Sequence, residues 1–489
     1  MPNISEILVN DDFGQVISSL CVDTIEYRDT REYYNEYHGE RRRRKTSVGW
    51  REPKRLAVYS DTLLDDKGNP LRLEDKIVDV ARIVTNFPKK EVRTSTAFMF
   101  GGKMTITGTE QNDGFQEFKR VWERKLKMQS VLKSFARKVL SESKAALVFY
   151  PYISKGLDGK LVTELKVKTL SVPRNANTFS EFYPHFDDND DLDAFIHRYQ
   201  VNSNGMLRNS CTIWTADKII TAIDEMGGWV KKEVPNLFGK IPVVYADVFQ
   251  PEWDEVAGII DAREMRLSRM ADTNDYFAEP ILKSYGDSDL PSKETTGKDI
   301  NFPIKVDEVT GKEYHGDADY LTWTGSQPSV DKELEETKNE QYSGTSTPDL
   351  SFDNLKGIGD LSGVARKFML MDATIKASDN MEVFGPVVQR CISVVLAGIC
   401  NITNIKYRPQ LVNNLIDVEF GSILPDDLAE TLQTLSIANG GKPINAQRTV
   451  TAHSPLTEDL DEEMKLMEEE EDTAAQRNNM VGLTMGYGE

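Results

Sequence analysis

The sequence predicts an α+β protein built from several parts rather than around one compact core. Its 489 residues correspond to roughly two to four domains of about 100 to 200 residues each. Strand-like segments gather between residues 145 and 248, and long helical patterns stand on both sides of them, as in an α+β chain. With 39% hydrophobic residues and a net charge of −20, the protein must also expose much solvated surface.

The first 143 residues begin without a clear pattern and end with a strong one. Residues 1–45 show weak periodicity and are predicted to form an arm. Asp65–Pro70 predicts a turn, and a helix is expected over 76–85, ending before Pro88. A first long helix is predicted over 115–143, where apolar residues recur at helical spacing: Phe118, Trp122, Met128, Leu132, Phe135 and Val139.

Strands dominate the next hundred residues. Ala145–Tyr150 predicts a short buried strand, and further strand-like runs cover 161–172, 193–201, 210–215 and 241–249. A second long helix is expected to begin at Pro251, because proline is favoured in the first turn of a helix. Polar residues interrupt its apolar face, which is typical of helices packed in a bundle or ring.

The remaining chain alternates polar segments with helices. Residues 280–329 are polar and broken by turns, and residues 330–342 predict a highly charged helix. A glycine-rich loop over 355–363 precedes a long helical stretch to Asn401, which Gly385–Pro386 should kink. We expect the chain to end with a strand over 415–420 and helices over 426–437 and 458–472, the last of them acidic.

Positive charge is concentrated in a short run and on one face of the 115–143 helix. The run consists of Arg41, Arg42, Arg43, Arg44 and Lys45. Such a run can lie along phosphates, or it can be a solvated arm or an edge contact with a neighbouring subunit, and the sequence leaves these readings open.

An acidic patch raises the question of a metal site. It consists of Asp187, Asp188, Asp190, Asp191 and Asp193, flanked by His185 and His197. A calcium loop starting at Asp187 would need glycine and glutamate where Leu192 and Arg198 stand. A solvated turn is the simpler reading, and a metal-dependent nuclease or other DNA-processing enzyme using Asp187–Asp193 is the alternative.

Motifs for other chemistry are incomplete, so we expect a protein that is not an enzyme and has no catalytic residue, cofactor or metal. Gly101–Lys103 lacks the first glycine and the hydroxyl residue of a phosphate-binding loop. The four cysteines form no CxxC pair, which indicates an intracellular origin with reduced thiols. No signal peptide and no apolar run of about 20 residues is present, so no membrane contact is expected.

Several passages stand in an order that resembles a known family. Residues 239–244 precede the helix 259–286, with its Ser268 and Asn274; Thr347–Leu350 and Leu361–Lys367 precede the next long helix. Ala146–Tyr150 follows a basic helix, and Ile416–Phe420 precedes Pro425 and an acidic helix. Together they resemble, over about residues 76–472, the portal proteins of tailed double-stranded DNA bacteriophages of the SPP-one-like portal family.

The resemblance implies an α+β, multi-part phage portal fold. Its parts would be an N-terminal arm (1–45), an α+β wing (46–250), a first stem helix (251–279), a small α/β clip (280–329), a second stem helix (330–348), a tunnel loop (349–361), a long kinked wing helix and strand (362–420), a helical crown (421–472) and a flexible tail (473–489).

The resemblance also implies a function. Twelve copies would form a ring at one capsid vertex of the virion, after synthesis in the host cytoplasm, with a channel for double-stranded DNA during packaging and ejection. Partners would be the terminase large subunit, head-tail adaptor proteins, and the major capsid and scaffold proteins. In the tunnel loop, Asn354 and Lys356 would touch phosphates without reading sequence, and Gly357 and Gly359 would permit unusual backbone conformations. An ordinary helix N-terminus capped by Asp360 or Ser362 is the other reading of that loop.

The net charge separates the remaining hypotheses. A charge of −20 disfavours a tight nucleic-acid binder, but a ring carrying 12 × (−20) = −240 would repel DNA and let it slide. Besides the nuclease, a scaffolding or adaptor protein whose basic arm binds an acidic partner remains an alternative.

Overall fold

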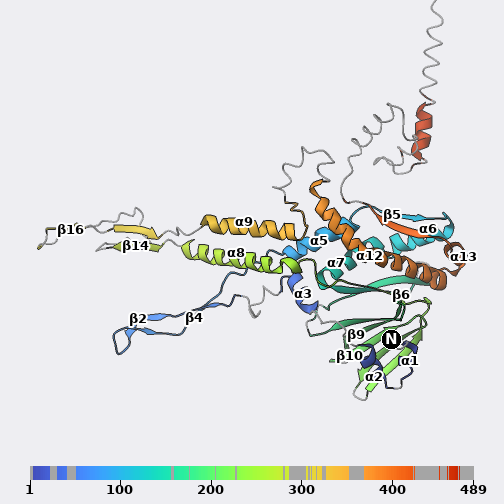
Figure 1. The fold of residues 1–489 in the computed structure, drawn as a ribbon, viewed down its shortest axis with the longest axis horizontal. Coiled ribbons are helices and arrows are strands. Elements are labelled where there is room, and N and C mark those ends of the chain that lie inside the picture. Colours follow the sequence, from blue (N-terminus) through green and yellow to red (C-terminus); the bar gives the residue numbers. More distant parts are fainter. Residues whose placement is uncertain are drawn as a thin grey trace, which may run out of the picture. The chain divides into compact units, whose positions relative to one another are not determined.

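The computed structural model (Figure 1) describes most of the chain between residues 51 and 351 and between residues 368 and 421. The residues described are 4–10, 12–21, 30–40, 51–155, 159–173, 175, 177–203, 205–225, 228–278, 281–285, 304–306, 309, 311–314, 317–321, 327–351, 368–421, 423, 451, 460, 462–471 and 473. The chain divides into two units, Met1–Lys356 with Met369–Ile423, and Gly357–Phe368 with Leu424–Glu489. In the second unit, residues 462–471 are helical.

The main core of the first unit joins three helices to a small sheet. The helices are α5 (Phe87–Phe100), α7 (Met128–Glu142) and α12 (Met371–Gly398). The antiparallel sheet has the order β13-β6-β7, formed by Val243–Asp247, Lys144–Lys155 and Leu161–Leu170. The Phe384 ring packs edge-on against Phe100 and Phe135, with centroids 5.9 and 6.3 Å apart. Aromatic packing therefore fixes α12 against α5 and α7.

A second sheet is an antiparallel meander whose central strands are buried on both faces. Its strands, in spatial order, are β12 (Gly228–Pro235), β11 (Lys218–Glu225), β10 (Met206–Trp214), β9 (Leu192–Ser203) and β8 (Ser180–Phe186). Along β9, Phe195 packs with Ala146 and Val243 of the first sheet, while Ile196 faces the opposite core cluster. This alternation is the two-residue period of a strand.

Three N-terminal helices pack onto this framework. α1 (Ile4–Ile7) and α2 (Phe13–Leu20) contribute apolar side chains to the cluster around Ile196. α3 (Thr30–Tyr37) places Tyr37 against Trp253, with ring centroids 6.0 Å apart. The predicted arm of residues 1–45 therefore contains packed helices in its described parts, because an eight-residue helix such as α2 is too short for its period to stand out in the sequence.

Two further helices lie side by side (Figure 1). They are α8 (Ala257–Ala278), preceded by the 3-10 turn η2 (Asp254–Val256), and α9 (Gln327–Gly344). Arg266 of α8 donates to Glu333 of α9 with N–O distances of 2.8 and 3.1 Å. Between them, β14 (Ile281–Tyr285) pairs with β17 (Asp317–Leu321), and β15 (Lys305–Val306) pairs with β16 (Glu313–Tyr314).

The predicted helix over 76–85 is wrong. Residues 76–78 form β4, which pairs with β1 (Lys54–Leu56), and residues 79–86 form neither helix nor strand. The amides of Ala81, Ile83 and Thr85 donate to side chains of α8 at 2.8, 2.9 and 2.7 Å, and the acceptors in that order are Asp272, Ser268 and Glu264. The three donors are two residues apart and the three acceptors are four residues apart. Two residues of an extended chain span about 6.6 Å and four residues of a helix about 6 Å, so donors and acceptors line up. Pro88 starts α5 instead of ending a helix.

The expected helix over 115–143 is present but interrupted. It consists of α6 (Asp113–Lys119), the π-helical segment η1 (Arg120–Lys125) and α7. Lys127, between η1 and α7, has a left-handed φ of 53° and interrupts the helix. The six apolar residues that predicted this helix are buried, so the periodicity identified the correct face.

Most other predicted elements are confirmed. The turn at Asp65–Pro70 joins β2 (Tyr59–Leu64) to β3 (Pro70–Arg72), and β18 (Ile416–Phe420) pairs with β5 (Met104–Gly108). The strands predicted between residues 145 and 249 and the charged helix over 330–342 are also present. The helix expected from Pro251 begins later, with η2 at Asp254 and α8 at Ala257. Three connecting segments, η3 (Ile399–Thr403), η4 (Ile405–Tyr407) and α13 (Arg408–Leu411), follow α12. The glycine-rich loop and the helix over 426–437 lie outside the described residues.

Buried groups in this core explain two sequence features. All four cysteines are free, and Cys211, Cys391 and Cys400 are buried. Burial raises the pKa of the Cys211 thiol to about 12 and also raises the pKa of Cys391 and Cys400. Residues 371–403 are long and apolar enough to cross a membrane, but 56% of that apolar window is buried inside the protein, as expected for a core helix.

Candidate functional site

The residues predicted to touch DNA lie outside the described part of the chain. These are the tunnel-loop residues Asn354, Lys356, Gly357 and Gly359, and the basic run Arg41, Arg42, Arg43, Arg44 and Lys45. The residues on both sides of the 352–367 segment are described, however. In α5, Lys90 binds Asp349, which precedes the segment, and the neighbouring Glu91 binds Lys376, which follows it. We call Lys90, Glu91, Asp349 and Lys376 the loop clamp.

The side of the clamp that precedes the segment is centred on Asp349. Lys90 Nζ lies 3.1 Å from Asp349 Oδ1, and Lys338 Nζ of α9 lies 2.7 Å from Oδ2. Lys90 also donates to the Tyr342 hydroxyl and sits 4.6 Å from the centre of that ring. Burial alone would raise the pKa of the Asp349 carboxyl, but the hydrogen bonds from Lys338 and Lys90 outweigh it and lower the pKa to about 2. Asp349 is therefore a carboxylate at any physiological pH.

The side that follows the segment is centred on Lys376 of α12. Its Nζ lies 2.9 Å from Glu91 Oε1 and 3.4 Å from Glu252 Oε1, and it donates to the Thr345 carbonyl at 2.8 Å. Asn380, one helical turn further on, donates to Glu252 at 2.9 Å. One ammonium thus serves two carboxylates and joins α12 to α5, to the end of α9 and to the segment after β13.

Lys376 supplies one ammonium group for two carboxylates, so the charges around it do not balance when Glu91 and Glu252 are both ionised. Glu91 is fully buried, and its Oε2 and that of Glu252 have no hydrogen-bond partner among the described residues. Burial raises the pKa of Glu91 to about 8; Lys376 opposes this rise, and the negative charge of Glu252 adds to it. Glu91 therefore favours its protonated form near neutral pH.

The loop clamp is built for position rather than for covalent chemistry. Successive residues of a helix point about 100° apart, so Lys90 and Glu91 reach different partners from one turn of α5. The residues that flank 352–367 are thereby held to the same rigid helix by charge-assisted bonds.

The acidic patch forms a turn. Asp187 Oδ1 accepts hydrogen bonds from the Asn189 and Asp191 amides at 2.8 and 2.9 Å, within the connection between β8 and β9. His185 Nδ1 lies 2.6 Å from Asp193 Oδ1. Burial lowers the pKa of His197 to about 3, and its ring bonds to the Ser180 hydroxyl. Among the described residues no three His, Cys, Asp or Glu side chains group as a metal site.

Sequence reasoning missed the loop clamp, although part of its signal was present. Glu91 lies on the α5 face that also buries Phe87 and Ser95, at spacings of four. A carboxylate on a buried face demands a partner. Lys376 and Asn380 show the same spacing on α12, but nothing local shows that the two faces meet.

Comparison with known proteins agrees with this architecture. The family model described as "Phage portal protein, SPP1 Gp6-like" matches residues 75–477. No curated protein matches the chain. The match covers most of the sequence, so the chain belongs to this family of phage portal proteins and is a structural component of the virion capsid. The family resemblance and the α+β class are thereby confirmed.

Replacing Lys376 by methionine should loosen the loop clamp. The change leaves two buried carboxylates without their cation, which costs about 3 kcal/mol, equivalent to roughly a hundredfold faster hydrogen exchange where α5 and α12 open locally. Amide hydrogen exchange read by mass spectrometry measures this. Lys125→Met is the matched control, because the Lys125–Glu164 pair is largely exposed and should contribute less than about 1 kcal/mol. Equal exchange in both variants would contradict the role of Lys376.

Replacing Glu91 by glutamine should change how stability depends on pH. The carboxyl has a pKa of about 8 in the folded protein and 4.5 as a free side chain. Because the folded state holds this proton more tightly, the stabilisation is full below pH 4.5 and is lost as pH rises through 8, at up to about 1.4 kcal/mol per pH unit. The wild-type thermal midpoint should therefore fall relative to Glu91→Gln between pH 5.5 and 8.5. Parallel pH profiles would rule this out.

Proposed function

We propose that twelve copies of this portal protein form a ring at one vertex of the capsid. DNA enters through the central channel during packaging and leaves through it during ejection. The ring would dock the terminase large subunit first and head-tail adaptor proteins later, and it would contact major capsid and scaffold proteins. The observation that carries this proposal is the family match over residues 75–477.

The paired helices support the assignment of a stem and a clip. The chain runs out along α8, passes through the short strand pairs, and returns along α9. The antiparallel pairing of Ile281 with Leu321 brings the two helices' connecting strands together. We assign α8 and α9 to the two stem helices and the strand pairs to the clip, with part boundaries as the sequence predicts them.

The loop clamp supports the assignment of a tunnel loop. A loop that contacts moving DNA must transmit force to the body of the ring, and charge-assisted bonds on both sides of residues 352–367 provide such anchorage. We therefore propose that Asn354 and Lys356 touch DNA phosphates and that Gly357 and Gly359 let the backbone adapt. The basic run Arg41–Lys45 is proposed as a second phosphate contact or a contact with a neighbouring subunit.

The nuclease alternative has no support in the described geometry, since Asp187 is engaged in its turn. The adaptor hypothesis depends on the Arg41–Lys45 run, and deleting these residues without loss of any assembly contact would argue against it.

Ring formation can be tested on the purified protein. Native mass measurement and negative-stain microscopy should show closed rings whose mass is a multiple of the 55.3 kDa chain. If the protein stays monomeric at every salt concentration, the proposal that it assembles into a portal ring is wrong.

The tunnel-loop proposal predicts that Lys356→Ala lowers the amount of packaged DNA while rings still form. Removing one phosphate contact from each subunit weakens the grip on the backbone without touching the loop clamp. Packaged DNA protected from nuclease is the measure, with Lys231→Ala on β12 as the control of equal charge. If packaging by the two variants is the same, Lys356 does not lie in the DNA path.

A further inference from the structure

One region of this acidic protein is strongly basic. Residues 119–168 contain thirteen Lys or Arg and four Asp or Glu, giving 13 − 4 = +9, within a chain of net charge −20. Eleven of the thirteen basic residues belong to the end of α6, to η1 and α7, and to the strands β6 and β7; Lys127 lies between η1 and α7, and Lys160 lies between β6 and β7. Some are neutralised locally, as in the Arg120–Glu117 pair at 2.7 Å and the Lys138–Glu142 pair at 3.3 Å. The rest must be solvated or meet an anion.

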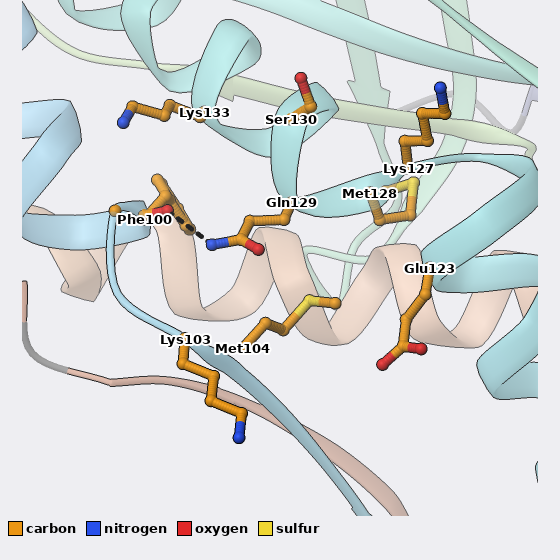
Figure 2. A pocket seen from close by; sticks show the side chains of 10 residues that line it. Phe100, Lys103, Met104, Glu123, Lys127, Met128, Gln129, Ser130 and Lys133 are labelled. Carbon is orange, nitrogen blue, oxygen red and sulfur yellow. Dashed lines mark hydrogen bonds between the residues drawn. The ribbon is translucent and has the colours of Figure 1, made fainter. Parts of the chain in front are cut away.

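An open pocket lies within this region, between the start of β5, η1 and the first turn of α7. Its volume is about 580 Å³, within the usual range for ligand pockets. Figure 2 shows Lys103, Lys127 and Lys133 on three different sides of it, with ammonium groups that do not converge on one point. Glu123 is its single acidic lining residue. Within the described part of the chain, none of the three lysines forms an ion pair.

Hydrogen bonds from the Gln129 side chain to the backbone fix one wall of the pocket. Gln129 Nε2 donates to the carbonyls of Phe100 and Gly102 at 3.1 and 2.7 Å, which ties the first turn of α7 to the end of α5. Figure 2 shows the bond to Phe100. Lys127, in its left-handed conformation, begins α7 without a side-chain cap. The positive end of a 15-residue helix thus adds to the lysine charges.

The lining discriminates between kinds of anion. Three separated ammonium groups suit a ligand with several spaced charges better than a single small ion. Phe100 and Met128 are almost completely buried, and six of the ten residues that line the pocket are polar or charged. Lysine, glutamine, serine and helix N-terminal amides are the groups that contact nucleic-acid backbones.

We propose that Lys103, Lys127 and Lys133 form a phosphate-binding surface for double-stranded DNA, independent of base sequence and separate from the proposed tunnel loop. Each lysine contacts a different phosphate along the rim of the pocket. The surface belongs to elements other than the stem helices and the loop clamp, so it goes beyond the channel function and does not depend on it.

The test is the salt dependence of binding to a short DNA duplex of about 25 base pairs, measured by fluorescence anisotropy on the full-length protein. A plot of log K against log salt has a slope of about −0.9 for each phosphate neutralised. The triple variant Lys103→Gln, Lys127→Gln, Lys133→Gln should therefore weaken binding and make the slope shallower by about 2.7 if all three lysines contact phosphates.

A matched variant separates this site from general electrostatics. Lys218→Gln, Lys231→Gln, Lys232→Gln removes the same charge from β11 and β12, and its slope should equal that of the wild type. The proposal is overturned if the first variant changes the slope by less than about 0.9, the share of one lysine, or if both variants change it equally. Binding of poly-glutamate that depends on the same lysines, without DNA binding, would also overturn it. Failure of this test leaves ring formation untouched, because microscopy reports on rings separately.

Discussion

A buried ammonium group must be matched by carboxylates, and the architecture around residues 352–367 depends on this requirement at Lys376. Its three bonds join α12 to α5, to the end of α9 and to the segment that follows β13. Because Lys90, the neighbour of Glu91, holds Asp349, α5 is the common anchor of the residues before and after the segment. Helices that are distant in sequence thus share one electrostatic constraint, which involves residues on both sides of 352–367.

How much the sequence could predict depended on whether the determining contacts were local. Phe118, Trp122 and Leu132 showed their buried face through periodicity, and the strands β6, β7, β9, β10 and β13 were evident from their composition. The segment 79–86 was mistaken for a helix because its amides bond to Glu264, Ser268 and Asp272, nearly two hundred residues later. No local pattern reveals that a four-residue helical spacing will match a two-residue extended one. Ser268, which the family resemblance singled out, accepts one of these hydrogen bonds, from the Ile83 amide, and this gives it a structural role.

The candidate site shows the same division. The residues proposed to touch DNA were chosen for their charge and their glycine context, and they remain predictions. Glu91 and Lys376, which hold the flanking residues, went unnoticed because each is one charged residue among 138 Lys, Arg, Asp and Glu residues, 59 + 79. Their importance comes from burial, which depends on the tertiary packing of Phe384 against Phe100. Charge segregation, by contrast, was visible in the sequence and corresponds to a basic surface around the first turn of α7.

The buried thiols have a consequence for the life of the particle outside the cell. Cys211 and Cys391 are fully enclosed, and burial keeps both protonated. Since the thiolate is the form that is oxidised and that undergoes disulfide exchange, these two thiols are unreactive. A virion leaves a reducing cytosol for oxidising surroundings, where exposed cysteines cross-link. At these two positions the protein can make that passage without a covalent change, so that a particle stored in the environment retains the packing with which it was assembled.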